Sequence, residues 1–408
     1  MRILSVVGAR PNFMKLAPVD RALAQRGDVQ HLIVHTGQHY DPDMSATFFE
    51  ELWIPAPDYH LGVGSGSHAA QTAAVMQRLE PVLVDLRPDV VLVYGDVNST
   101  LAAALVAAKL GLRVGHVEAG LRSDDWTMPE EVNRVVTDRL AELLFIPSRD
   151  AGANLLAEGI VADRIHFVGN VMIDSLCWAL PQALERDVAA KYALRDTGYV
   201  VVTLHRPCNV DDPATLRQLV GALQCLSRHL PVVFPVHPRA RKHLRAAGLA
   251  VEGAGDFRLI EPVGYLDMLG LVAGARLVIT DSGGLQEETT FLGVPCLTVR
   301  PNTERPITCT HGTNRLVPPN RDAILAAAER AVARQVPVRP MLERWDGRSA
   351  ERIARVLCEG EQFDAQAPDA AFAVQTSDAV PGDAIFANGT EAVADRLATV
   401  FSFKEVPT

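Results

Sequence analysis

The sequence lacks the long apolar segments that mark membrane proteins. No run of about 18 apolar residues occurs in the 408-residue chain, so no segment is expected to cross a membrane. The opening stretch, MRILSVVGARP, has an apolar run too short for a signal peptide, and it is interpreted as a first strand. These absences predict a cytoplasmic protein with no membrane partner.

Paired cysteines and excess positive charge are also absent. The six cysteines include no C-x-x-C pair, which argues against a zinc knuckle or a disulfide framework and fits a reducing compartment. The formal net charge is −10, which argues against a nucleic-acid partner. Any phosphate on a ligand must therefore be bound by local positive groups.

What is present is a repeating pattern of short strands and helices. Hydrophobic residues make up 48% of the chain and charged residues 22%, an ordinary globular balance. Strand-like runs alternate with helical segments, which predicts an α/β protein with two doubly wound, Rossmann-like domains facing each other across a cleft. The predicted strands are Ile3–Val7, Leu32–His35, Val90–Tyr94, Val114–Val117 and Leu143–Ile146, followed by Val200–Leu204, Val232–Val236, Leu277–Thr280 and Cys296–Val299.

The predicted domains cover 1–170 and 171–347. Gly169-Asn170 closes the first set of strands, and a charged, helix-prone stretch, Asp174–Arg195, leads into the second. Residues 361–395 contain no lysine or arginine and many alanines, so 361–408 is expected to be an acidic, weakly structured tail.

Polar groups follow most of these strands. In doubly wound sheets, ligands bind at the carboxyl ends of the strands. Any one such residue is more often a cap or a surface residue, but six strand ends of this kind together favour a ligand cleft. The groups are Arg10 with Lys15, Asp96, Glu118 with Arg122, His205 with Arg206, His237 with Arg239, and Asp281 with Ser282.

The segment 277–306 carries the clearest anion-binding pattern. A short strand is followed by Ser282, Gly283 and Gly284 and then by a helix, which places free N–H groups and the positive end of a helix dipole together. Glu288, like its neighbour Glu287, could accept hydrogen bonds from a hydroxylated ligand, and Arg305 could supply a counter-charge. An ordinary strand–helix turn explains this segment equally well when it is taken alone.

Two further motifs have competing interpretations. Thr127 and Glu130 have the spacing of a capping box, which is favoured for the segment in isolation, although its position after Glu118 also allows a place in the cleft. Asp41-Pro42-Asp43 resembles a metal-binding D-x-D, but its proline favours a turn, and no metal is assigned.

Taken together, these motifs resemble the non-hydrolysing UDP-N-acetylglucosamine 2-epimerases. The matching segments keep the family's order over roughly residues 1–358 and are more specific together than any one of them. They are Gly8-Ala9-Arg10-Pro11 with Lys15; Thr36-Gly37-Gln38-His39; Gly95-Asp96; His116 to Arg122; Pro129 to Arg134; Gly169-Asn170; His205-Arg206; Pro235-Val236-His237-Pro238; Asp281 to Glu288; and Thr303-Glu304-Arg305-Pro306.

The resemblance implies a glycosyltransferase-B-like (GT-B-like) fold in which a last helix, 348–360, crosses back to the first domain. It implies inversion at C2 of UDP-N-acetylglucosamine to give UDP-N-acetylmannosamine, by loss of UDP to a 2-acetamidoglucal and re-addition. It also implies a homodimer, a role in polysaccharide biosynthesis, and no metal or redox cofactor.

The resemblance also implies roles for individual residues. Asp96, Glu118 and Glu130 match the catalytic carboxylates, while His205 and Arg10 would stabilise the leaving diphosphate. Ser282, Gly283 and Gly284 would hold the phosphates and Glu288 the ribose, with the uracil near Val263 to Met268 and with Lys15 and Arg305 near the sugar or its phosphates.

Departures from the family pattern, among them Cys208, and four alternatives accompany this interpretation. Cys208 stands where the family usually has a glutamate, which removes a charge beside His205. The same site could act on a UDP-diacetamido uronic acid, could hydrolyse the intermediate to free N-acetylmannosamine and UDP, or could belong to a glycosyltransferase. A binding protein without activity would be expected to have lost Asp96, Glu118, Glu130 or His205.

Overall fold

The computed structural model describes residues 1–38, 49–195, 198–236, 238–248, 256–333 and 340–363. The chain divides into two compact units. Unit 1 comprises residues 1–175 and a segment that begins at Glu343, and unit 2 runs from Leu176 to Leu342. Asp41-Pro42-Asp43 and nearly all of the predicted tail lie outside the described residues. In the described part of the chain, no helix is long and apolar enough to cross a membrane.

Unit 1 is built on a parallel sheet of seven strands in the order β3-β2-β1-β4-β5-β6-β7. The chain order reverses between β1 and β4, which is where doubly wound sheets bind ligands. The strands are β1 (Arg2–Val7), β2 (Gln30–His35), β3 (Tyr59–His60), β4 (Val90–Tyr94), β5 (Arg113–Val117), β6 (Leu143–Ile146) and β7 (Ile165–Phe167).

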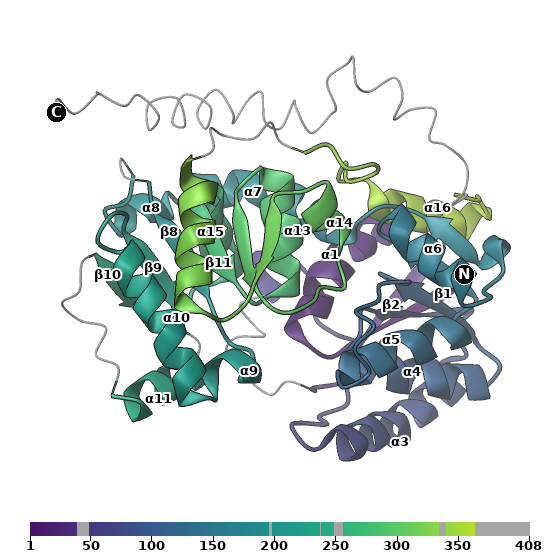
Figure 1. Ribbon diagram of the computed structural model, residues 1–408. Helices are drawn as coiled ribbons and strands as arrows, with labels where there is room; N and C mark the ends of the chain where they lie inside the picture. The colour runs from purple at the N-terminus through teal and green to yellow at the C-terminus, as the bar shows by residue number, and fades with distance from the viewer. Residues whose placement is uncertain (39–48, 196–197, 237, 249–255, 334–339, 364–408) are drawn as a thin grey trace. The chain divides into compact units, whose positions relative to one another are not determined.

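Helices cover both faces of this sheet. On one face, α3 (His68–Leu86), α4 (Asn98–Lys109) and α5 (Pro129–Leu140) lie side by side (Figure 1). Apolar residues of α3, α4 and α6 (Arg149–Ala157) form one core with those of β1, β4, β5 and β6. The short helix η1 (Ala162–Arg164) precedes β7. Elsewhere in unit 1, α1 (Arg10–Ala24) packs against α16 (Ser349–Glu359).

The C-terminal segment is tied to the rest of unit 1 by hydrogen bonds. Asp174 is buried and accepts hydrogen bonds from the backbone N–H groups of Ser349 (3.1 Å) and Ala350 (2.7 Å), the first residues of α16. Beyond α16, the Phe167 N–H donates to the carbonyl of Phe363 (2.7 Å). Phe363 is itself buried, so the folded part of unit 1 extends past residue 360, where the tail was expected to begin.

Unit 2 is built on a parallel sheet of six strands in the order β10-β9-β8-β11-β12-β13. The order again reverses at a central pair, β8 and β11. The strands are β8 (Val200–Thr203), β9 (Val232–Pro235), β10 (Phe257–Ile260), β11 (Leu277–Thr280), β12 (Cys296–Val299) and β13 (Asn314–Val317).

Two apolar cores lie on opposite sides of this second sheet. One joins the sheet to α9, α10, α11 and α15, and the other joins it to α8, α12 and α13. The helices of unit 2 are α8 (Val188–Lys191), α9 (Pro207–Val210), α10 (Pro213–Leu226), α11 (Pro238–Ala246), α12 (Tyr265–Ala273), α13 (Gly283–Leu292), α14 (Ile307–Thr310) and α15 (Arg321–Ala333). Helix α7 (Val171–Glu185) carries the chain from unit 1 into unit 2.

The predicted α/β class with two doubly wound domains is confirmed. Each predicted strand is present to within one residue at either end, except that β2 begins two residues before the predicted Leu32. The units divide after Ser175 and Leu342, whereas the predicted boundaries were 170 and 347. Four strands, β3, β7, β10 and β13, were not predicted.

Candidate functional site

Glu118 stands at the carboxyl end of β5, beside a buried lysine. The ammonium of Lys15, on α1, forms an ion pair with the Glu118 carboxylate, and both side chains are only 4% exposed. Gly95 makes this approach possible, because a Cβ atom there would lie 2.7 Å from Lys15 Nζ and 3.2 Å from Glu118 Oε2. The backbone of Glu118 has φ +73°, a conformation that only glycine adopts without cost.

Asp96 follows Gly95 and is held by the helix α5. Arg134 Nη1 lies 2.5 Å from the Asp96 carboxylate, and Arg134 Nε donates to Glu131 (2.8 Å). The side-chain amide of Asn133 donates to the Asp96 carbonyl (2.8 Å). Burial raises the pKa of Glu131, but hydrogen bonds from Ser123 N–H and Arg134 outweigh it, so this pKa lies below its usual value. Arg134 is therefore balanced by two carboxylates.

Glu130 lies in the first turn of α5, where it is partly exposed. The capping-box prediction for this turn is wrong. The helix N-cap is Met128, no side chain caps it, and the Thr127 hydroxyl instead donates to Asp125 (2.6 Å). Pro129 opens the helix because its fixed φ suits the first position.

Arg10 is the first residue of α1 and is exposed. The start of this helix is fixed by Asn12, whose side-chain oxygen accepts from the N–H groups of Gly8 and Ala9 (both 3.2 Å). The Asn12 amide donates to the Tyr94 carbonyl (2.8 Å) at the end of β4. Arg10 and Lys15 are thus presented by one helix whose first turn is tied to the strand end that precedes Gly95 and Asp96.

In unit 2, His205 is oriented by a buried carboxylate. Asp281, fully buried at the end of β11, lies 2.8 Å from His205 Nδ1 and accepts hydrogen bonds from the N–H groups of His205 (3.0 Å) and Arg206 (2.9 Å). Burial raises the pKa of Asp281, but its interactions with His205, Asn209 and the Arg206 N–H together outweigh burial and hold the pKa below its usual value. With Nδ1 directed at Asp281, the other ring nitrogen of His205 is left for a ligand, and the side chain is 48% exposed.

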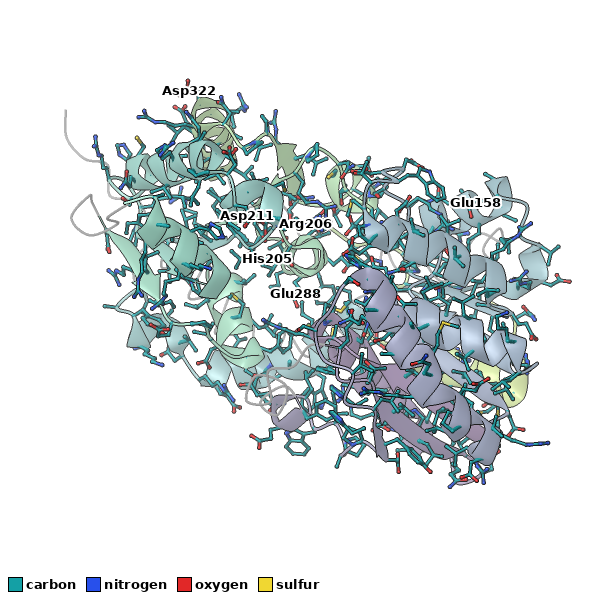
Figure 2. The ribbon with its side chains drawn as sticks, turned by 90° about the horizontal axis from the view of Figure 1, so that it is seen from below. Glu158, His205, Arg206, Asp211, Glu288 and Asp322 are labelled. Carbon is teal, nitrogen blue, oxygen red and sulfur yellow. The ribbon has the colours of Figure 1, made fainter. Side chains whose placement is uncertain are left out.

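The turn before α13 has the geometry that anion binding requires. Ser282 is the N-cap residue and Gly283 and Gly284 begin the helix, so their N–H groups have no carbonyl of the preceding turn to bind. A Cβ atom at Gly283 would lie 2.7 Å from Arg305 Nη1, so a larger residue would have to displace the Arg305 guanidinium. Glu288 comes from the next turn of α13, while His205 comes from the loop after β8 (Figure 2).

Arg305 is engaged by carboxylates of its own unit. Its Nε lies 3.0 Å from Glu287, and its Nη1 pairs with Glu304. Arg300 pairs with Glu304 as well (2.7 Å), which makes a buried group of two arginines and two glutamates. Glu287 and Glu288 were predicted together as ligand-binding carboxylates, but Glu287 serves to hold Arg305.

The remaining predicted residues lie near the surface of unit 2. Val263 precedes α12 and Met268 lies within it, and both are half-buried. Cys208 is an exposed free cysteine in α9. In the residues that the structure describes, no group of three histidine, cysteine or acidic side chains is arranged to hold a metal ion.

Sequence reasoning assigned no role to Arg134 or to the partnership of Asp281 with His205. The partnership of Asp281 with His205 had a signal in the sequence, because both residues follow strands that end at the same sheet edge. This signal could be used only once β8 and β11 were known to be neighbours.

The fold and these groups define a two-domain α/β enzyme of the GT-B-like class. The sequence model of the UDP-N-acetylglucosamine 2-epimerase family matches residues 21–358, and the chain belongs to this family. UDP-N-acetylglucosamine 2-epimerase of Methanococcus maripaludis is 44% identical over 332 residues, which cover 80% of this chain and 90% of the relative.

Two further comparisons extend this result. The crystal structure of UDP-GlcNAc 2-epimerase from Methanocaldococcus jannaschii, in complex with UDP-GlcNAc and UDP, has a TM-score of 0.81 at 42% identity, covering 88% of this chain and all of that one. UDP-2,3-diacetamido-2,3-dideoxy-D-glucuronate 2-epimerase of Pseudomonas aeruginosa is also 42% identical, again over 88% of this chain and all of the relative.

Proposed function

We propose that this protein interconverts UDP-N-acetylglucosamine and UDP-N-acetylmannosamine by inverting C2 of the sugar. The observation that carries the proposal is the pair of ion pairs, Lys15–Glu118 and Arg134–Asp96, that meet at the Gly95-Asp96 turn of unit 1. Carboxylates held in place by buried cations are suited to moving a proton at a fixed position. Membership of the epimerase family names the substrate class on which they act.

Unit 2 would bind the UDP part of the substrate. The N–H groups of Gly283 and Gly284, with the Ser282 hydroxyl, would hold the diphosphate at the start of α13. Glu288 would accept hydrogen bonds from the ribose hydroxyls, and backbone groups between Val263 and Met268 would bind the uracil. Arg305 would add positive charge beside Gly283, where its Nη1 lies 2.7 Å from the position that a Cβ atom would take.

The chemistry would begin with cleavage of the C1–O bond. Its electron pair leaves with the diphosphate of UDP, whose growing charge is stabilised by His205 and Arg10. As C1 becomes electron-poor, a carboxylate removes the proton from C2, and the C2–H electrons form the C1=C2 double bond of 2-acetamidoglucal. Re-addition of UDP at C1, with protonation of C2 on the opposite face, completes the inversion.

Opposite faces of C2 require more than one acid/base group. Asp96, Glu118 and Glu130 are the proposed set, since they come from the ends of β4 and β5 and from the start of α5. Lys15 would hold the Glu118 carboxylate in place and would lie near the sugar. No step in this route transfers electrons to an acceptor, and we propose that neither a metal nor a redox cofactor takes part.

The setting is proposed from the same family membership. We propose that the enzyme works in the cytoplasm as a homodimer and supplies an activated sugar for polysaccharide synthesis. The proposed partners are the UDP-sugar and a second copy of the chain, with no nucleic acid and no membrane.

A second candidate substrate is a UDP-2,3-diacetamido uronic acid. It is favoured by the Pseudomonas aeruginosa relative, whose identity to this chain (42%) is within a few per cent of that of the Methanococcus maripaludis UDP-N-acetylglucosamine 2-epimerase (44%). The segment Thr303-Glu304-Arg305-Pro306 favours the plain N-acetylglucosamine substrate.

The test is proton NMR of UDP-N-acetylglucosamine incubated with the enzyme in deuterated water. We expect UDP-N-acetylmannosamine to appear and deuterium to enter C2 of both sugars. Free N-acetylmannosamine with free UDP would instead identify a hydrolysing enzyme. If UDP-N-acetylglucosamine stays unchanged while the diacetamido uronic acid substrate exchanges its C2 proton, the second candidate is correct.

A further inference from the structure

A charged network with a fully buried centre lies beneath the three proposed carboxylates of unit 1. His116, on β5, and Asp138, on α5, are both completely buried, and His116 Nδ1 lies 2.6 Å from Asp138 Oδ1. The other carboxylate oxygen of Asp138 lies 2.7 Å from Arg122 Nη1. Arg122 in turn binds Glu158 through two hydrogen bonds (2.6 and 2.8 Å), and Glu158 stands at the end of α6 at the outer edge of its unit (Figure 2).

The hydrogen-bond partners fix the orientation of His116. Its Nε2 lies 2.8 Å from the carbonyl oxygen of Gly95, and its Nδ1 faces the Asp138 carboxylate, so both ring nitrogens are engaged. Burial raises the pKa of Asp138, but His116 and Arg122 outweigh it and keep this pKa below its usual value.

The network contacts each chain segment that carries a proposed reacting carboxylate. The Gly95 carbonyl, held by His116, immediately precedes Asp96. The Gly120 N–H, which donates to Asp138 (3.1 Å), comes two residues after Glu118. Asp138 itself lies on α5, about two helical turns beyond Glu130. Neither His116 nor Asp138 is exposed, so neither can touch a substrate.

We propose that Asp138 and His116 are positioning residues for the epimerase reaction, fixing Asp96, Glu118 and Glu130 relative to one another through a single buried ion pair. This inference rests on the proposed function, since it takes those three carboxylates as the reacting groups. Its physical basis is that general acid/base catalysis is sensitive to displacements of the order of 1 Å, and a buried ion pair admits few alternative geometries.

Unit 1 also contains a matched control pair. His31 Nδ1 lies 2.7 Å from Asp20, and His31 Nε2 lies 2.8 Å from the Ser5 hydroxyl. Asp20 is on α1 and only 15% exposed, so it too is a largely buried carboxylate paired with a histidine. The hydrogen bonds of this pair run on through Ser5 to the Tyr94 hydroxyl (2.8 Å), a side chain, whereas those of His116 and Asp138 reach the backbone of Gly95 and Gly120. Replacing Asp20 therefore tests the general cost of losing such a pair.

The experiment compares Asp138→Asn and Asp20→Asn in the full-length enzyme. Asp138→Asn should lower kcat by about 100-fold with little change in KM, because the misplaced groups act in the transition state. Asp20→Asn should leave kcat within about 2-fold of wild type, in line with its distance from the reacting groups. The double variant Asp138→Asn/His116→Gln should lose little more than the worse single variant, since the two residues act as one unit.

Loss of folding and loss of positioning are separated by a second measurement. NMR of enzyme labelled with ¹⁵N-histidine should show a hydrogen-bonded ring N–H of His116 in the wild type that is protected from exchange with solvent, absent in His116→Gln and shifted in Asp138→Asn. A His116 ring N–H that exchanges freely in wild-type enzyme overturns the inference without any variant having to fold. If the wild-type enzyme is active and Asp138→Asn has the same kcat, the inference is overturned as well. If the wild-type enzyme shows no epimerase activity, the proposed function is overturned instead.

Discussion

Glu118, which we propose as a reacting group, has an unfavourable backbone conformation. Its φ of +73° costs a non-glycine residue roughly 1 kcal/mol, and its carboxylate is buried against Lys15. A glycine would relieve the backbone but would remove the carboxylate. The N–H groups of Glu118 and Ala119 both donate to the carbonyl of Phe145 on β6 (3.1 Å each), which holds the turn in place. Local strain is thus maintained at the position where the chemistry is proposed to occur.

The Lys15–Glu118 pair should show strong thermodynamic coupling. Lys15→Met leaves a buried carboxylate without its partner and should lower the free energy of unfolding by about 3 kcal/mol. The double variant Lys15→Met/Glu118→Gln should be more stable than Lys15→Met, because no uncompensated charge remains. Chemical denaturation of the four proteins of this cycle measures the coupling, and additive effects would show that the two side chains do not interact.

Glu118→Gln alone should abolish C2 inversion while UDP still binds, because UDP is assigned to unit 2. NMR exchange at C2 and calorimetric titration with UDP provide the two measurements. Normal turnover by this variant would remove Glu118 from the mechanism.

Asp281 should control the activity of His205. In Asp281→Asn the histidine loses the carboxylate that fixes its Nδ1 proton, and kcat should fall by about 100-fold. Asp256→Asn is a suitable control, since Asp256 is a partly exposed carboxylate of unit 2 that pairs with Arg258. Steady-state kinetics should compare the kcat of both variants with that of wild type. Equal activities would mean that Asp281 serves the fold of the loop and not the histidine.

Among the helices, α16 depends on a carboxyl group with a displaced pKa. Burial raises the pKa of Asp174 to about 7, against the opposing effect of the hydrogen bonds from Ala350 and Ser349. The folded state therefore binds the proton more tightly than the unfolded state, where the pKa is 3.8. Stability from this group is present below pH 4 and is lost as pH rises from about 4 to about 7, by up to about 1.4 kcal/mol per pH unit.

Asp174→Asn should remove that dependence. The difference in free energy of unfolding between wild type and Asp174→Asn should change steadily, in favour of the variant, as pH rises from 5 to 7, and should level off above 7. Urea denaturation at a series of pH values gives this difference. A constant difference across the range would mean that Asp174 keeps an ordinary pKa.

The strand β7 carries a histidine, His166, whose pKa is lowered by burial, so its effect on stability has the opposite dependence on pH. His166 is buried, neither ring nitrogen has a hydrogen-bond partner in the described part of the chain, and burial, with a smaller effect of Arg113, lowers its pKa to about 4. Because the unfolded pKa is 6.5, stability is lost as pH falls from about 6.5 to about 4. His166→Leu should stabilise the protein by about 1 kcal/mol at pH 7 and by more at pH 5. Thermal unfolding at both pH values tests this, and a variant less stable than wild type at pH 5 would contradict it.

Prediction from the sequence succeeded for strands whose own residues carry a clear pattern. β4, β6, β11 and β12 are short apolar runs bounded by turn residues, and their predicted limits match the structure. The edge strands β3, β10 and β13 expose side chains on one side, so their apolar pattern is weak. β7 spans only three residues and contains His166, which interrupts the run.

The site residues were likewise predictable where a local pattern placed them and not where a distant partner did. Strand ends indicated where Asp96, Glu118 and His205 would lie, because topology fixes that edge. Partners such as Arg134 for Asp96, and Asp138 for His116, come from a helix whose orientation about its own axis the sequence does not specify. The capping box at Thr127 failed because a nearby aspartate competed successfully for the hydroxyl.

At the scale of the whole chain, Phe363 returns to unit 1 and packs against it. Its ring is buried beneath Arg355 (5.0 Å to the ring centroid) and Arg344 (5.4 Å), and its carbonyl binds β7. A chain ending at Phe363 should therefore keep the stability and activity of unit 1. A chain ending at residue 361, like Phe363→Ala in the full-length protein, should lose about 3 kcal/mol. Unfolding measurements on the three proteins test this, and a destabilised 1–363 chain would show that later residues contribute.

The division of unit 1 between the two ends of the chain has a consequence for its biosynthesis. Ribosomes make roughly 5–20 residues per second, so roughly 10 s or more separate the appearance of Asp174 from that of the helix it caps. During that interval the whole of unit 2 is produced, and its own sheet has every strand it needs. α1 meanwhile lacks its partner α16, and the edge of β7 stays uncovered. The sheet of unit 2 can thus form before unit 1 has its last helix, and unit 1 is the one for which a nascent chain would need protection.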